Sequence, residues 1–118
     1  MRLASIDIGS NAIRLLVNNV FSYNGSVQYQ KETLIRVPLR LGREAFNDKV
    51  ISDEKRTKLI KAMEGYRSMM EVFDVDNYQA CATSALRDAA NGEEIVNSIR
   101  QQSGIDIQII SGQEEAQI

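Results

Sequence analysis

The sequence has 118 residues, of which 43% are hydrophobic and 25% charged, and its formal net charge is −2. These values predict one soluble globular domain. The mild negative charge argues against a nucleic-acid or anionic-membrane surface, because such partners require a summed basic field. The absence of histidine excludes histidine-based catalysis and histidine-based metal sites within these 118 residues. The single cysteine forms no intramolecular disulfide, so we expect a cytoplasmic protein. No apolar run approaches the ~18 residues of a membrane span.

Three antiparallel strands are expected to open the chain. Alternating or continuous apolar residues predict strands at Leu3–Ile8 and Ile13–Val20. Asn24-Gly25 is a strong hairpin signal, since both residues tolerate positive φ, and it leads into a third strand over Ser26–Val37. Pro38 is expected to end that strand or to place it on an edge of the sheet.

Helices and single strands are expected to alternate in the rest of the chain. Arg40–Val50 is predicted to be a loop or a short irregular segment, and Ser52 is predicted to cap a long helix over Asp53–Phe73. The next expected elements are a strand at Tyr78–Thr83, a helical turn at Ser84–Ala90 and a helix at Glu93–Gln102. A strand at Ile105–Ile110 and the start of a helix at Ser111–Ala116 follow. The order predicts an α/β domain with a five-stranded mixed sheet, its three antiparallel strands first, flanked by helices.

The first candidate motif follows the first strand. Asp7 ends the strand, and Gly9, Ser10 and Asn11 form a small-residue turn before Arg14. Turn N–H groups and an arginine suit a phosphate, and the Asp7 carboxylate suits Mg²⁺ held jointly with substrate oxygens. The alternative is an ordinary β-hairpin turn, because these are also common turn residues.

The second candidate motif comes at the end of the fourth predicted strand. Thr83, Ser84 and Arg87 lie where ligands bind in open α/β sheets, beyond the carboxyl ends of strands. The alternative is that the two hydroxyls cap the next helix while Arg87 pairs with a surface carboxylate. The local sequence slightly favours this alternative.

Glu114 and Glu115 follow the last predicted strand. A carboxylate in this place suits a general base acting on water. Acidic residues are also common in the first turn of a helix, where they interact favourably with the helix dipole, and on local grounds that interpretation is preferred. Arg36, Arg40 and Arg43 form a basic cluster that we interpret as a solvated loop rather than a polyphosphate contact.

Together these motifs resemble the exopolyphosphatase/guanosine-pentaphosphatase (Ppx/GppA) family, and the resemblance spans nearly the whole chain. The matching segments are Ile6–Asn11, Arg36-Val37 with Leu39 and Gly42, Ala82–Arg87 and Ile109–Ala116. Ser10-Asn11 after Asp-x-Gly distinguishes this family from the sugar kinases and actin-like ATPases that share its fold. Ala12 departs from the family, which usually has a polar residue there, so one side-chain donor of the loop is missing.

The resemblance implies a ribonuclease H-like lobe of the actin-like ATPase superfamily. Residues 1–118 would be the N-terminal lobe of a two-lobed phosphatase, and a second lobe would carry another phosphate loop. The implied activity is hydrolysis of terminal phosphoanhydride bonds in inorganic polyphosphate or guanosine pentaphosphate, with Mg²⁺ or another divalent cation. The lobe alone is expected to be nearly inactive, and its inter-lobe face offers a surface for a homodimer.

The resemblance also implies roles for individual residues. Glu115 matches the general base, and Asp7 matches the carboxylate near the metal. The phosphate-binding set is Gly9, Ser10, Asn11, Arg14, Thr83, Ser84 and Arg87, of which Ser10, Asn11, Arg14 and Arg87 match phosphate-contacting positions of the family. Two other functions share the fold and stay open: a kinase or actin-like ATPase lobe, and a non-catalytic phosphate- or nucleotide-sensing module.

Overall fold

The computed structural model describes residues 1–111 and contains one five-stranded sheet. The strands run in the spatial order β3-β2-β1-β4-β5. Their bounds are β1 Arg2–Ile8, β2 Ile13–Tyr23, β3 Ser26–Val37, β4 Asn77–Ala82 and β5 Gln108–Ile109. The β1, β2 and β3 strands pair antiparallel, whereas β4 pairs parallel with both β1 and β5. The predicted mixed sheet is therefore confirmed.

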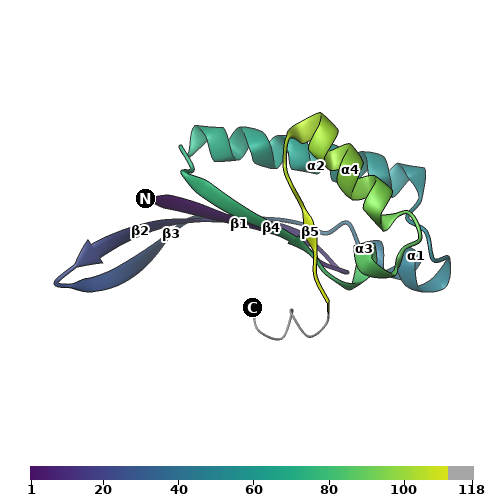
Figure 1. Ribbon diagram of the computed structural model, residues 1–118, viewed down its shortest axis with the longest axis horizontal. Helices are drawn as coiled ribbons and strands as arrows, with labels where there is room; N and C mark the ends of the chain where they lie inside the picture. The colour runs from purple at the N-terminus through teal and green to yellow at the C-terminus, as the bar shows by residue number, and fades with distance from the viewer. Residues whose placement is uncertain (112–118) are drawn as a thin grey trace.

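Four helices accompany the sheet in the described part of the chain. They are α1 Leu41–Asn47, α2 Asp53–Val72, α3 Ser84–Asp88 and α4 Gly92–Ser103. Figure 1 shows α2 and α4 side by side over one face of the sheet, while α1 and α3 lie together at one end. The opposite face carries no helix from the described residues. We call it the helix-free face. None of these helices has the length and apolarity needed to cross a membrane.

The hydrophobic core fills the space between the sheet and its helices. In β1 and β2 the alternating residues Ile6, Ile8, Ile13 and Leu15 are at most 2% exposed, and they meet Leu59 and Met63 of α2 and Ile95 and Ile99 of α4 in one cluster. Because successive strand residues face opposite sides of the sheet, the residues of β1 and β2 that alternate with these buried ones lie on the helix-free face.

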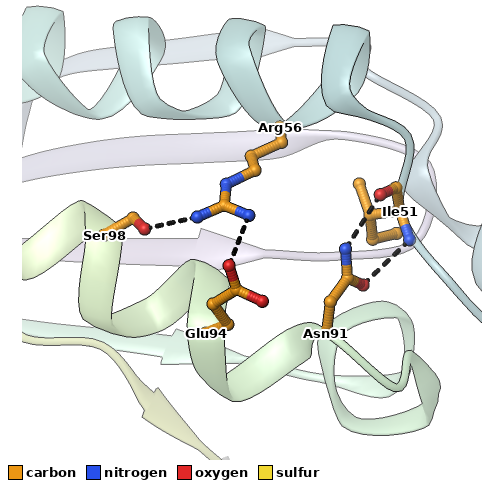
Figure 2. Close-up of polar contacts among 5 residues, drawn as sticks. All are labelled: Ile51, Arg56, Asn91, Glu94 and Ser98. Atoms are coloured by element: carbon orange, nitrogen blue, oxygen red, sulfur yellow. Dashed lines mark hydrogen bonds and ion pairs between the residues drawn. The ribbon is translucent and has the colours of Figure 1, made fainter.

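Polar contacts join the two long helices to each other and to the segment before α2 (Figure 2). The Arg56 guanidinium of α2 donates to the Glu94 carboxylate at 2.9 Å and to the Ser98 hydroxyl at 2.7 Å, both on α4. The side chain of Asn91 forms two hydrogen bonds with the backbone of Ile51, accepting from its N–H and donating to its carbonyl. These contacts hold the start of α4 against the start of α2.

Tyr66 of α2 links the helix layer to the strand β3. Its hydroxyl donates to the carbonyl of Ile35 at 2.9 Å, and the side chain is only 3% exposed. Burial raises the pKa of Tyr66 to about 12, so the phenol stays neutral and keeps this hydrogen bond at physiological pH.

The turns and ends agree with the sequence at several points. Asn24 and Gly25 both have positive φ, as the predicted hairpin requires, and Pro38 follows the last residue of β3. The side chain of Ser52 accepts from the N–H of Lys55 and caps α2. Gly104 ends α4 in the left-handed conformation.

Two expectations about elements were wrong. Arg40–Val50 is not only loop, because it contains α1, in which Leu41 and Ala45 are spaced one turn apart and both buried. A helix of seven residues gives too short a pattern to recognise in the sequence. The last strand is two residues long instead of spanning Ile105–Ile110, since only Gln108 and Ile109 pair with β4. The expected helix start beyond Ser111 lies outside the described residues.

Candidate functional site

The turn between β1 and β2 is held through its carbonyl groups. The N–H of Gly9 donates to the carbonyl of Ala12 at 3.0 Å, Arg40 N–H donates to Asn11 at 3.0 Å, and Gly42 N–H donates to Ser10 at 2.9 Å. Three consecutive carbonyls of the turn are therefore occupied by backbone donors.

The N–H groups of the same three turn residues, unlike their carbonyls, are not used by the fold of the described residues. Among residues 1–111, no hydrogen bond uses the backbone N–H of Ser10, Asn11 or Ala12. Most backbone N–H groups in folded proteins have a partner, supplied by protein or by water. Consecutive N–H groups that the fold does not use are the chemical basis of an anion-binding turn.

Gly42 at the start of α1 makes a close approach to this turn. An added Cβ at position 42 would lie 2.7 Å from the Cβ of Ser10 and 3.3 Å from its carbonyl oxygen. The absence of a side chain at position 42 therefore allows α1 to bind the turn through its backbone.

The second motif lies directly against the first. The hydroxyls of Ser10 and Ser84 are 2.6 Å apart and share a hydrogen bond, and Thr83 N–H donates to the carbonyl of Ile8 at 3.1 Å. Thr83 occupies the N-cap position of α3, but its side chain makes no capping bond and instead reaches the Ile8 carbonyl at 3.5 Å. Two segments more than 70 residues apart in sequence thus form one surface at the end of the sheet.

Arg87 connects α3 to the end of β5. Its guanidinium donates to the carbonyl of Ile110 at 2.9 Å and lies 3.7 Å from the carboxylate of Asp88. These contacts position the backbone around Ile110. The phosphate-binding role implied for Arg87 stays a prediction.

Asp7 lies on the helix-free face next to a hollow of about 300 Å³. Ser5, Asp7, Gln79, Cys81, Thr83 and Ile110 are among the residues that line it. Arg14 is directly opposite Asp7 in the β1–β2 register and is exposed. The structure therefore brings Asp7, Thr83 and the backbone held by Arg87 to one hollow.

A second hollow, of about 520 Å³, lies at the end of the sheet. Ser10, Asn11, Gly42 and Ser84 are among its lining residues. The predicted site residues are thus divided between two neighbouring hollows, one on the helix-free face and one at the strand ends.

The described residues offer limited support for a divalent cation. They contain no group of three or more acidic, cysteine or histidine side chains that would enclose a metal. Asp7 supplies one exposed carboxylate. Mg²⁺ is commonly bound by one or two carboxylates together with substrate phosphates and water. The residues fit a cation held jointly with a phosphate substrate and do not form an all-protein site. Glu115, the implied base, lies outside the described residues.

Comparison with known proteins identifies the family. Residues 25–118 match the model of the Ppx/GppA phosphatase family. The chain therefore belongs to the Ppx/GppA phosphatase family.

Two related proteins are similar to this chain over nearly its whole length. The chain is 31% identical to a bifunctional 3-dehydroquinate synthase/phosphatase of Fusobacterium nucleatum, over 98% of this chain and 18% of that protein. It is 29% identical to exopolyphosphatase 1 of Mycobacterium tuberculosis, over 100% of this chain and 33% of that protein. The chain thus spans a third or less of the length of these two relatives.

Solved structures agree with the fold. A Ppx/GppA family member from Aquifex aeolicus superposes with a TM-score of 0.86 at 26% identity, covering 98% of this chain and 36% of that one. An exopolyphosphatase from Cytophaga hutchinsonii superposes with a TM-score of 0.89 at 23% identity, covering 99% of this chain and 36% of that one, which supports the fold alone. The ribonuclease H-like, actin-like ATPase fold is confirmed.

Sequence reasoning missed the role of Arg40 and Gly42 in supporting the first motif. The backbone of Arg40 and Gly42 holds the turn, yet this segment was expected to be loop. The only available signal was Gly42 itself, because glycine often marks a close approach of backbone segments.

Replacing Gly42 with alanine tests the close approach. The new methyl group would contact Ser10, so Gly42→Ala should lower the free energy of unfolding by about 1–3 kcal/mol, the usual cost of overpacking. The matched control is Gly65→Ala in α2, where an added Cβ meets nothing within 4 Å. That variant should gain about 0.5–1 kcal/mol, because alanine favours helix over glycine. Urea unfolding measures both, and equal stability changes would contradict the proposed packing.

Proposed function

We propose that the whole protein hydrolyses terminal phosphoanhydride bonds of inorganic polyphosphate, guanosine pentaphosphate, or both, in the cytoplasm. The observation that carries the proposal is the turn at residues 9–12. The carbonyls of Ser10, Asn11 and Ala12 are occupied, and the N–H groups of the same three residues are unused within the described residues. Membership of the Ppx/GppA phosphatase family and similarity to exopolyphosphatase 1 support it.

In this proposal the turn binds the terminal phosphate and Glu115 acts on water. The water oxygen forms a bond to the terminal phosphorus while the bond from that phosphorus to the bridging oxygen breaks. Glu115 takes the proton of the water, and the shortened polyphosphate leaves with the bridging oxygen. Charge develops mainly on phosphate oxygens, so oriented N–H groups and arginines contribute more than covalent chemistry does.

The proposal assigns the rest of the phosphate site to a second lobe of the whole protein. The 118-residue chain alone should then release phosphate from polyphosphate at least about 100-fold more slowly than the whole protein, because losing even one stabilising donor costs that much in other enzymes. A phosphate-release assay at equal molar concentration measures this. Comparable rates would show that this chain contains the complete site.

A divalent cation at Asp7 is part of the proposal. When bound, the cation would neutralise charge on the substrate phosphates. Asp7→Asn in the whole protein should raise the Mg²⁺ concentration needed for half-maximal activity by about tenfold or more, because the carboxylate charge is lost. Asp74→Asn is the control, since Asp74 is exposed and lines neither the hollow beside Asp7 nor the hollow at the strand ends. An unchanged Mg²⁺ requirement in Asp7→Asn would rule this assignment out.

The general base is tested with a pair of neighbouring variants. Glu115→Gln in the whole protein should lower kcat by about 10²–10⁴-fold, the usual contribution of general-base catalysis, while leaving KM for polyphosphate nearly unchanged. Glu114→Gln removes the same charge one residue earlier and should retain activity. Activity that persists in Glu115→Gln, or is lost equally in both variants, would show the base assignment to be wrong.

A further inference from the structure

Four polar side chains form a row across the helix-free face. In the strand registers Asp7 of β1 is directly opposite Cys81 of β4 on one side and Arg14 of β2 on the other, and Arg14 is directly opposite Arg36 of β3. Arg14 and Arg36 are both exposed. The row therefore has the order Cys81, Asp7, Arg14, Arg36, with the two arginines adjacent.

Two like charges in this arrangement repel one another. Residues directly opposite in an antiparallel pair have Cβ atoms about 4.5–5.5 Å apart, and like charges there are destabilising. Within residues 1–111, no ion pair includes Arg14 or Arg36. Asp7 flanks Arg14, but Arg36 lies on β3, which is the edge strand of the sheet formed by residues 1–111. The pair carries positive charge that a bound anion would offset.

The pair is also close to the turn that carries the proposed phosphate site. Arg14 follows Ala12 by two residues, which in a strand corresponds to about 7 Å at about 3.4 Å per residue. This distance is within the length of an arginine side chain. An anion at the pair would therefore lie next to one held by the N–H groups of the turn.

We propose that Arg14 and Arg36 jointly bind a second phosphate group of a linear polyphosphate, adjacent to the group bound at the turn. The inference rests on the proposed function and adds Arg36 to the site. Planar guanidinium groups bind phosphate oxygens in pairs, and two facing arginines match a group with several charged oxygens. The feature recognised in this proposal is a phosphate group joined to another phosphate group by an anhydride bond. A nucleoside triphosphate contains the same feature. Orthophosphate has no second group to place at the pair.

A matched pair of variants tests the role of Arg36. Arg36→Gln in the 118-residue chain should weaken binding of tripolyphosphate about tenfold or more, as expected for loss of a charge-assisted contact, and leave orthophosphate binding unchanged. Lys31→Gln is the control: Lys31 is exposed on the same strand but lies opposite Asn18, so no arginine faces it. NMR titrations at low ionic strength measure the dissociation constants. Equal effects of the two variants on tripolyphosphate would overturn the inference.

The same titrations separate failure of the inference from failure of the proposed function. Tripolyphosphate should shift the backbone amide signals of Ser10, Asn11 and Ala12 and also the Nε–H signals of Arg14 and Arg36. Shifts at the turn without shifts at the arginines would overturn the inference and leave the proposed function standing. Absence of shifts at both would overturn the inference and also the assignment of the turn as the phosphate site, on which the proposed function depends. GTP in place of tripolyphosphate identifies whether a nucleotide can supply the second group.

The unliganded variants provide a second readout. Because Arg36→Gln removes one of two facing positive charges, it should raise Tm at low ionic strength, and the increase should shrink as salt screens the charges. Lys31→Gln should show no such salt-dependent gain. A lower Tm for Arg36→Gln at every salt concentration would contradict the repulsion on which the inference depends.

Discussion

The candidate site depends on the backbone contacts that hold the turn between β1 and β2. Arg40 and Gly42 donate to the carbonyls of Asn11 and Ser10, and Gly9 donates to that of Ala12. A turn of this length would otherwise have several conformations in which carbonyls face the same space as N–H groups. Because the carbonyls are engaged, the turn combines a fixed backbone with unused donors, which is what electrostatic recognition of phosphate requires.

This constraint explains why distant segments converge. The turn needs α1 on one side and the hydroxyl of Ser84 on the other, so the start of α1 and the end of β4 must both reach the same end of the sheet. Buried Leu41 of α1 and Leu86 of α3 anchor those segments in the core, at 0% and 1% exposure. The core thus fixes the site indirectly, through the two short helices at its edge.

Sequence patterns predicted the parts of this arrangement that have local causes. The Asn24-Gly25 hairpin, the Ser52 cap and the strand periodicities depend on neighbouring residues, and they were confirmed. The short helix α1 was missed, because its conformation depends on packing between Leu41 and residues distant in sequence. The pairing of Arg14 with Arg36 was also beyond sequence reasoning. It requires the exact β2–β3 register, and a bulge between Val17 and Asn18 shifts that register away from a simple count from the turn.

The two faces of the sheet have different roles because they meet different surroundings. On the helix face, Ile8, Ile13 and Leu15 are fully buried, and their exposure to water would weaken folding. On the helix-free face, Arg14 and Arg36 are exposed and directly opposite each other in the β2–β3 register, and like charges in such positions are destabilising. A stability cost of this kind is expected at binding sites, where the arrangement suits a ligand better than it suits the unliganded fold. The facing positions of Arg14 and Arg36 therefore favour anion binding at this edge of the sheet.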